Sequence, residues 1–372
     1  MNKKSPSPTL AVQRLLGWYQ NHARPLPWRK TLDPYGIWIS EIMLQQTQVG
    51  TVIPFWERWM KELPDAASLA SAPLQRVYKL WEGLGYYRRA RFLKEAAEII
   101  QTQHNGAFPQ TFEAMLALPG IGRYTAGAVC SIAFDQPYPV LDGNVKRVLS
   151  RYEAIREPLK DKKTENKLWK LSATWVNQAA TLSFSYARPC SSINQALMEL
   201  GATICLPRNP MCNHCPIHLS CKAFANGLQA EIPVVSIRQP ATEISMTAVV
   251  LKKASLFLVR HKEKDRWHQG LWEFPSETVI DPSNKEVSPF MKLIKSRNTS
   301  PFLPVKIIKH TVTRFRIQTT AHFLDLNHAS PRLLERMSGE WLTRDRLEAI
   351  PMSAAHVKIR KIVLNHLRDG MS

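Results

Sequence analysis

The sequence contains no uninterrupted apolar run long enough to cross a bilayer or to form the core of a secretion signal. We therefore expect the chain to act in the cytoplasm, in association with the nucleoid. Cysteine is also scarce, with 6 among 372 residues, so a small scaffold stapled by disulfides is not expected. The length and a hydrophobic content of 44% are sufficient for two folded domains.

Acidic residues are few in comparison with basic ones. There are 30 Asp and Glu against 50 Lys and Arg, which gives a formal net charge of +20. This excess favours a polyanionic partner, most often nucleic acid, and its spread along the chain indicates a binding surface rather than a basic tail. On charge alone, a generally basic protein without such a partner is the simpler alternative.

The pattern of apolar residues changes near residue 243. Residues 1–225 show apolar residues at three- and four-residue spacing, interrupted by short Gly, Pro and Asp breaks, which predicts an all-α domain. Residues 226–242 are rich in breakers and predict a linker. Residues 243–372 contain β-rich runs with short helical pieces, so we predict a smaller α+β domain there.

Four of the six cysteines lie close together in the sequence, separated by gaps of six, two and five residues. They are Cys205, Cys212, Cys215 and Cys221. In a chain without a secretion signal, such spacing indicates a metal centre before disulfides. A zinc site with mixed ligands is one alternative, since His214 and His218 lie in the same loop. The uneven spacing differs from the paired C-x2-C of a zinc ribbon and favours a [4Fe–4S] cluster.

The segment "LPGIGRYTAG", residues 118–127, places two glycines between two helical patterns. Gly120 and Gly122 allow close backbone approach, and the helix that follows directs free N–H groups at an anion. A helix–hairpin–helix of this kind grips the DNA backbone without reading its sequence. Most glycine pairs merely end a helix, so this motif gains weight only beside the net charge and the cysteine loop.

Two acidic residues have the environments that cleavage of a glycosidic bond requires. Glu41 lies in the largely apolar "WISEIMLQQTQV", which predicts a partly buried carboxylate, although a solvated helix face is the simpler reading. Asp142 lies in "YPVLDGNVKRVL", where a helix N-cap is the simpler reading. In such a pair, one acid protonates the leaving group while the other stabilises a positively charged, oxocarbenium-like sugar.

These segments together resemble the helix–hairpin–helix DNA glycosylases, and within them the MutY-type adenine DNA glycosylases. The resemblance covers nearly the whole chain and includes "PLPWR", "DPYGIWISEIMLQQTQV", "GLGYYRRAR", "LPGIGRYTAG", "VLDGNVKRVLSR" and the cysteine loop. It implies removal of adenine mispaired with 8-oxoguanine or guanine in duplex DNA, by an enzyme that carries a [4Fe–4S] cluster and acts as a monomer. Because the adenine is inaccessible within the stacked duplex, it must first be flipped out.

The resemblance also implies roles for individual residues. Glu41 would protonate adenine at N7 and later assist the attacking water, Asp142 would stabilise the cationic sugar, and Asn144 would orient Glu41. Tyr124 stands where related bifunctional glycosylases carry a lysine that forms a Schiff base. Tyrosine cannot form that imine but can hydrogen-bond to a neighbouring carboxylate. A monofunctional hydrolase that leaves an abasic site in an intact strand is therefore expected.

Four more residues are expected at the DNA by the same resemblance. Arg24 and Arg29 would border the adenine pocket, Gln46 would fill the vacated stack, and Tyr86 would wedge beside the opposite base. Without the resemblance, a solvated helix face would be the prediction for Gln46 and core packing for Tyr86.

The second domain resembles the Nudix-like module that contacts 8-oxoguanine in this family, through "HQGLWEFPSE" at residues 268–277. No Glu-rich Nudix box follows, so pyrophosphate hydrolysis is not expected. Residues 308–310, Ile-Lys-His, are assigned to the recognition loop, in which only His310 keeps the residue type usual in the family.

Two other functions are compatible with parts of this pattern. A glycosylase directed at pyrimidines, such as one acting on G·T mismatches, would share the hairpin, the cluster and Asp142, but it would not need the acid at Glu41. A non-catalytic DNA-binding protein with a redox-sensing cluster would need neither acid.

Overall fold

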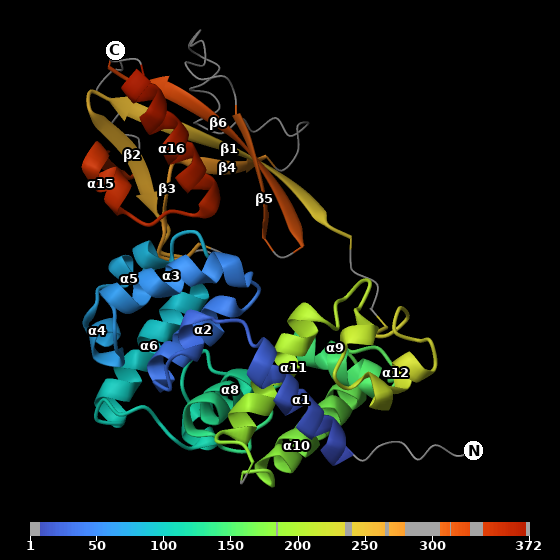
Figure 1. Ribbon diagram of the computed structural model, residues 1–372. Coiled ribbons are helices and arrows are strands. Elements are labelled where there is room, and N and C mark those ends of the chain that lie inside the picture. Colours follow the sequence, from blue (N-terminus) through green and yellow to red (C-terminus); the bar gives the residue numbers. More distant parts are fainter. Residues whose placement is uncertain are drawn as a thin grey trace. The chain divides into compact units, whose positions relative to one another are not determined.

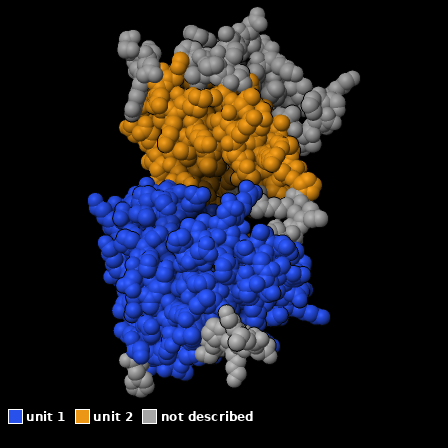
Figure 2. All heavy atoms as spheres, turned by 45° about the vertical axis from the view of Figure 1, so that its right-hand side comes forward, with its two compact units in different colours: residues 1–71, 92–237 blue, residues 72–91, 238–372 orange. Residues whose placement is uncertain are grey.

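The computed structural model describes residues 8–183, 185–234, 240–264, 268–279, 306–312, 314–327 and 338–369. The chain divides into two compact units, coloured separately in Figure 2. Unit 1 contains residues 1–71 and 92–237, and unit 2 contains residues 72–91 and 238–372. A short piece of the predicted helical domain therefore clusters with the C-terminal part of the chain. Among the described residues, no helix has both the length and the apolar composition needed to cross a membrane.

The described residues of unit 1 form helices and turns, which confirms the predicted all-α domain (Figure 1). The α-helices are α1 (Pro8–His22), α2 (Pro34–Leu44), α3 (Val49–Glu62), α4 (Ala66–Ser71), α6 (Arg88–Gln103, which begins in unit 2), α7 (Phe112–Leu116), α8 (Arg123–Phe134), α9 (Gly143–Tyr152), α10 (Lys162–Ala180), α11 (Pro189–Thr203) and α12 (Lys222–Ala225). Three short 3-10 helices are η1 (Pro27–Arg29), η2 (Cys212–His214) and η3 (His218–Ser220).

Helices α2, α8 and α11 form the centre of unit 1. Helix α2 begins at Pro34 after Asp33, whose carboxylate accepts hydrogen bonds from the N–H groups of Tyr35 and Gly36. All residues from Tyr35 to Met43 are buried, so the helix is surrounded by protein. It packs against α3 and α8, while α11 packs against α1, α8, α9 and α10. An acid on α2 is consequently buried unless a cavity reaches it.

Helical periodicity continues through residues 41–60 of the sequence, but the structure breaks it. Helix α2 ends at Leu44 and α3 begins at Val49, because Gln46 adopts a left-handed backbone conformation with φ of 58°. This geometry ends a helix. The alternative that Gln46 lies on a solvated helix face is therefore excluded, and the residue lies in an exposed turn.

Unit 2 contains a mixed β-sheet with helices, which confirms the predicted α+β domain (Figure 1). Its described strands are β1 (Thr242–Lys253), β2 (Leu256–His261), β3 (Trp272–Glu273), β4 (Ser276–Val279), β5 (Lys306–Val312), β6 (Phe315–Asp325) and β7 (Glu340–Thr343). The main order is β3-β2-β1-β6-β5, with β4 paired to β1 and β7 to β2. Strands β1 and β6 are parallel, with Thr242 opposite Phe315, and the other pairs are antiparallel.

The described part of unit 2 also contains the helices α5 (Leu74–Trp81), α15 (Arg344–Ala349) and α16 (Ala354–Asp369). Helix α16 lies across the sheet and contacts β5 and β6. Ile308 of β5 belongs to the hydrophobic core of this unit, with 5% of its surface exposed. Residues 308–310 are thus part of a strand that continues to Val312, whereas the resemblance placed them in a loop.

Candidate active site

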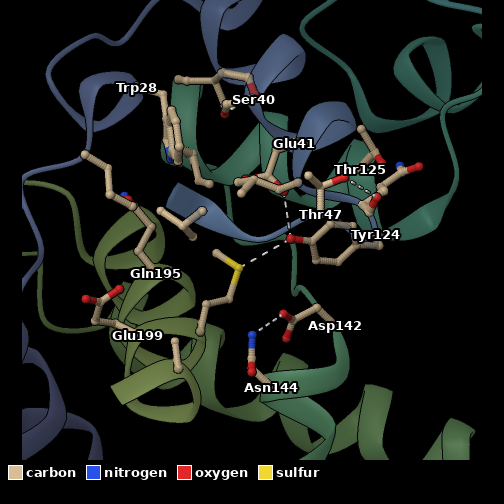
Figure 3. Close-up of a pocket in the computed structure, with 18 of the residues that line it drawn as sticks. Trp28, Ser40, Glu41, Thr47, Tyr124, Thr125, Asp142, Asn144, Gln195 and Glu199 are labelled. Atoms are coloured by element: carbon tan, nitrogen blue, oxygen red, sulfur yellow. Dashed lines mark hydrogen bonds between the residues drawn. The ribbon is translucent and has the colours of Figure 1, made fainter. Parts of the chain in front are cut away.

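A cavity of about 610 Å³ opens in unit 1 and is lined entirely by residues of that unit. Its walls come from η1, α2, the turn after α2, the start of α8, the start of α9, and α11. Figure 3 shows Glu41 and Tyr124 pointing toward one another in this cavity. Asp142 and Asn144 lie on the other side of the Tyr124 hydroxyl from Glu41. The two acids identified in the sequence are thus brought to one cavity from separate helices.

The Glu41 side chain is buried, with 6% of the residue exposed. Its Oε2 accepts a hydrogen bond of 2.7 Å from the Tyr124 hydroxyl. Burial raises the pKa of Glu41 to about 7; the Tyr124 hydrogen bond opposes this rise, and the charge of Asp142 adds to it. A carboxyl group with this pKa holds a proton on an appreciable fraction of molecules at neutral pH, as a general acid must.

Asp142 is the N-cap of α9, and its Oδ1 accepts a hydrogen bond of 2.7 Å from the Val145 N–H. Its Oδ2 accepts a second bond, of 2.9 Å, from the Asn144 side-chain amide. Burial raises the pKa of Asp142, while both hydrogen bonds and the charge of Arg147 lower it. The capping role and the position in the cavity are compatible, because a helix N-terminus favours a negative charge.

The structure corrects the role predicted for Asn144. Its amide donates to Asp142, and its Oδ1 accepts a hydrogen bond of 2.9 Å from Arg147, so it orients the aspartate rather than Glu41. The partner of Glu41 is Tyr124, which confirms the predicted hydrogen bond between this tyrosine and a neighbouring carboxylate. Burial and the nearby acids raise the pKa of the Tyr124 phenol well above its usual value, so the hydroxyl remains a donor.

The two glycines of the hairpin differ in backbone conformation and in the space around them. Gly120 has φ of +74°, and a Cβ atom there would lie 2.6 Å from Cβ of Phe92. Gly122 is the N-cap of α8 with an ordinary φ of −97°, and a Cβ there would meet nothing within 4 Å. Gly120 thus shapes the hairpin, whereas Gly122 leaves the N-terminus of α8 open to an approaching anion.

Comparisons with known proteins agree with this geometry. Residues 39–174 match the family model of HhH-GPD superfamily base excision DNA repair proteins, and residues 246–361 match that of the NUDIX domain. The adenine DNA glycosylase of Rattus norvegicus is 33% identical over 412 residues, which cover 96% of this chain and 78% of the relative. The chain belongs to the adenine DNA glycosylases. It is an enzyme that hydrolyses the N-glycosidic bond of adenine in DNA.

Other relatives of the glycosylase extend the comparison. The adenine DNA glycosylase of Buchnera aphidicola subsp. Acyrthosiphon pisum (strain APS) is 38% identical over 265 residues, covering 71% of this chain and 73% of the relative. The solved structure of a thermostable thymine-DNA glycosylase is 29% identical with a TM-score of 0.51, and covers 59% of this chain and 97% of its own. This match is shorter than that to the rat relative, which covers 96% of this chain.

Arg24 and Arg29 line the active-site cavity of the glycosylase, but both are paired with an acid that the sequence analysis missed. Glu199 of α11 is fully buried and accepts hydrogen bonds of 2.6 Å from Nε of Arg24 and 2.8 Å from Nη2 of Arg29. Burial would raise the pKa of Glu199, but the two arginines lower it overall. An acid within the apolar "NQALMELG" was the available signal, of the same kind as for Glu41.

A chain of hydrogen bonds leads from the active site to the cysteine loop. Arg147 holds Asn144 through Nη2, and its Nε donates a bond of 2.7 Å to the carbonyl oxygen of Cys205. The same Nη2 donates a bond of 2.7 Å to the Gly201 carbonyl oxygen. Cys205 is thus linked to Asp142 through two intervening side chains. Arg147 was not identified from the sequence.

The four cysteines of the loop are free thiols that line one small cavity together with Arg151. Nη1 of Arg151 lies 3.3 Å from Sγ of Cys205 and donates to the Leu206 carbonyl oxygen. Soft thiolate ligands around a common cavity, beside a buried guanidinium, fit the donor set of an anionic iron–sulfur centre. Among the residues that the structure describes, no three His, Cys, Asp or Glu side chains are grouped closely enough for a single metal ion.

The remaining predicted site residues differ in position. Gln46 lines the active-site cavity from the turn after α2. Tyr86 and His310 belong to unit 2. Tyr86 has φ of 50° and is 42% exposed, so core packing is excluded as its role. His310 is half-buried in β5, and burial together with the charge of Lys358 lowers its pKa.

Proposed function

We propose that the enzyme removes adenine paired with 8-oxoguanine or with guanine in duplex DNA, acts as a monomer, and leaves an abasic site in an intact strand. The observation that supports this proposal most directly is the 2.7 Å hydrogen bond between Tyr124 and Glu41, in a cavity that Asp142 also lines. A Nudix-like unit in the same chain supports recognition of the opposite base by a second module. The formal net charge of +20 supports a DNA partner.

The proposed reaction begins when adenine is flipped from the duplex into the cavity. Protonated Glu41 donates its proton to N7 of the base, which makes adenine a better leaving group as the glycosidic bond breaks. The carboxylate of Asp142 then faces the positive charge that develops on the sugar. Glu41, now ionised, accepts a proton from the water that attacks C1′. Glu41 thus begins the reaction in the protonated state that its burial favours.

Hydrolysis without strand cleavage follows from the residue at position 124. A bifunctional glycosylase uses an amine to attack C1′ and form a Schiff base. The described lining of the cavity contains no lysine, and the Tyr124 hydroxyl is engaged with Glu41. We therefore propose that water is the nucleophile and that no imine forms.

We propose that the cysteine loop holds a [4Fe–4S] cluster through its four thiolates. A bound cluster would supply a rigid cross-link within the loop. Arg151 would balance the negative charge of the thiolates, since its guanidinium lies 3.3 Å from Sγ of Cys205. Arg147 donates hydrogen bonds both to the Cys205 carbonyl oxygen and to Asn144, so an ordered loop would help to fix Asn144, which holds Asp142 in place.

Contact with the duplex is proposed to involve three exposed features. The N-terminus of α8 at Gly122 would bind a backbone phosphate. Gln46 would occupy the space left by the flipped adenine, and Tyr86 would insert beside the base opposite it. His310 is proposed to act in unit 2, on the 8-oxoguanine side.

The test compares duplexes that each contain one A·8-oxoG, A·G, T·G or thymine glycol site, with products analysed before and after alkali. We expect strand breaks only after alkali, and only for the adenine duplexes. Breaks without alkali would refute the monofunctional mechanism. Cleavage of the T·G or thymine glycol duplex in place of adenine would favour the pyrimidine-directed alternative.

A pair of variants tests the proton donor. Glu41→Gln keeps the size of the side chain but cannot donate a proton, so we expect binding without excision. Glu57→Gln, on the exposed face of neighbouring α3, is the matched control and should retain full activity. Normal turnover by Glu41→Gln would assign the proton donor elsewhere. For the metal, elemental analysis for iron and a visible absorption band, lost in Cys215→Ser, distinguish a cluster from zinc.

A further inference from the structure

The loop that carries Tyr86 has an unusual backbone. Gly83, Gly85 and Tyr86 have φ values of 117°, 71° and 50°, so the chain turns sharply between α5 and α6. A tyrosine in the left-handed region is strained and persists only where its surroundings fix it. The carbonyl oxygen of Gly85 accepts hydrogen bonds from Trp81 (2.9 Å) and Arg89 (3.2 Å), which hold the turn from within.

The two residues that flank this turn are held by one residue of the C-terminal sequence. Oε1 of Glu82 accepts a hydrogen bond of 2.9 Å from the Met352 N–H. The Tyr87 hydroxyl donates a bond of 2.9 Å to the Met352 carbonyl oxygen. Met352 is itself fully buried and forms a β-bridge with Trp272. Both ends of the Tyr86 turn are thus fixed to a single peptide segment of the Nudix-like unit.

A buried ion pair reinforces this attachment. Nη2 of Arg360 donates a hydrogen bond of 2.8 Å to Oε2 of Glu82, and their side chains are only 7% and 12% exposed. Nη1 of Arg360 donates to the carbonyl oxygens of Leu347 and Ile350, so these bonds fix the guanidinium in the orientation that pairs with Glu82. Lys79 also reaches Oε2 of Glu82, at 3.0 Å. Charge pairs that are shielded from water are weakened little by salt.

Helix α5 is attached to the same unit by a further close contact. A Cβ atom at Gly270 would lie 2.7 Å from Cε2 of Tyr78, so the backbone of the Nudix-like unit lies directly against this helix. Gln75 donates a hydrogen bond of 2.9 Å to the Gly270 carbonyl oxygen and accepts one of 3.2 Å from Trp272. These contacts place α5 and the turn that follows it in unit 2.

We propose that Arg360 and Met352 form a clamp that sets the conformation of residues 82–87 and thereby positions Tyr86. The proposal rests on the proposed insertion of Tyr86 into the duplex. Arg360 is a positioning residue, which acts through Glu82 and does not touch DNA. The Nudix-like unit thus contributes to reading the mispair in two ways, through its own surface and through the wedge that it holds. Weakening the clamp lowers affinity for the mispair and leaves the bond-breaking step intact.

The first test measures the loop without DNA, by hydrogen exchange of peptides that cover residues 82–91 in the full-length enzyme. We expect exchange about tenfold faster in Arg360→Met, because local opening depends on the contacts that close the loop. Arg316→Met is the matched control, since it removes an exposed ion pair with Glu243 in the same unit. Equal exchange in the two variants would refute the clamp.

The second test measures affinity for a duplex with uncleavable 2′-fluoroadenosine opposite 8-oxoguanine. Arg360→Met and Tyr86→Ala should each weaken binding about tenfold, and the double variant should be no weaker than the worse single variant, since coupled residues are not additive. A double variant weakened about a hundredfold would show independent effects and contradict the proposal. The single-turnover rate at saturating enzyme should change less than about threefold in Arg360→Met, because only transition-state contacts alter it.

The two tests separate the clamp from the proposed role of Tyr86. If Arg360→Met accelerates exchange while Tyr86→Ala binds normally, the clamp stands and the wedge role fails. If Arg360→Met does not fold, Arg360→Lys replaces it in both assays. That variant retains the charge but loses the forked donors, so we expect partial effects in exchange and in binding.

Discussion

Replacing Tyr124 by phenylalanine removes a single hydroxyl group and should move the pH at which excision is lost. The Tyr124 hydroxyl donates to Oε2 of Glu41 at 2.7 Å, and this bond stabilises the ionised carboxylate. Burial outweighs it and raises the pKa of Glu41 to about 7. Without the donor, burial and the charge of Asp142 still raise the pKa of Glu41, and the charge of Arg29 is left to lower it. The pKa of Glu41 should therefore rise further.

The size of this shift follows from the strength of the bond. A hydrogen bond to a charged group contributes about 1.5–3 kcal/mol, and about 1.4 kcal/mol corresponds to one pH unit. Loss of the Tyr124 hydroxyl should raise the pKa of Glu41 by about 1–2 pH units. In the proposed mechanism protonated Glu41 is the active form, so the rate should fall as the pH rises through this pKa. The descending limb should move from near pH 7 to between about pH 8 and pH 9.

The assay is the single-turnover rate of adenine excision, measured between about pH 5.5 and pH 9.5 with enzyme in excess. Tyr138→Phe is the matched control, since it also removes a phenol hydroxyl in unit 1 but leaves Glu41 untouched. Its profile should coincide with that of the parent enzyme. A descending limb in Tyr124→Phe that stays in place or moves to lower pH would refute the assignment of Glu41 as the acid.

Three further predictions concern stability, measured by denaturant unfolding. Because burial raises the pKa of Glu41 from 4.5 to about 7, the free energy of unfolding of the parent enzyme should fall by about 3 kcal/mol as the pH rises between those values. Glu41→Gln should therefore be more stable than the parent by about 3 kcal/mol above pH 7, while the two proteins should show the same pH dependence of stability below pH 4. Gly120→Ala should cost at least about 2 kcal/mol, from its positive φ and the contact with Phe92, whereas Gly122→Ala should cost less than about 1 kcal/mol; equal losses would contradict the different roles of the two glycines. Glu199→Gln should cost about 2–3 kcal/mol, because the partly buried Arg29 and the more exposed Arg24 lose the buried counter-charge of Glu199, and a neutral effect would mean that solvent or another acid compensates them.

The sequence was sufficient to predict the features that depend on residues close to one another in the chain. The spacing of apolar residues predicted helices before residue 225 and strands after 243, because each element buries one face with its own period. Glu41 was identified because its apolar neighbours in the sequence indicated a partly buried carboxylate, and it is buried in a cavity wall. Asp142 was identified by its place before a helix, and it caps α9.

Features that depend on contacts between distant parts of the chain could not be predicted from the sequence. The hydrogen bond from Arg24 to Glu199 joins residues 175 positions apart, so nothing near either residue in the sequence indicates it. The pairing of Arg360 with Glu82 joins residues 278 positions apart. Residues 308–310 were assigned to a recognition loop through the resemblance alone, and the structure has them in strand β5.

The same cavity contains two buried glutamates whose pKa values are shifted in opposite directions. Glu41 meets a neutral hydroxyl, which cannot offset the cost of burying a charge, so its pKa rises to about 7. Glu199 meets two guanidinium groups, which lower its pKa despite complete burial. Only Glu41 therefore carries a proton that it can give to a base, while Glu199 stays ionised and holds Arg24 and Arg29 at the wall. The chemistry of the cavity is decided by the charge of the donor that each carboxylate meets, because burial is common to both.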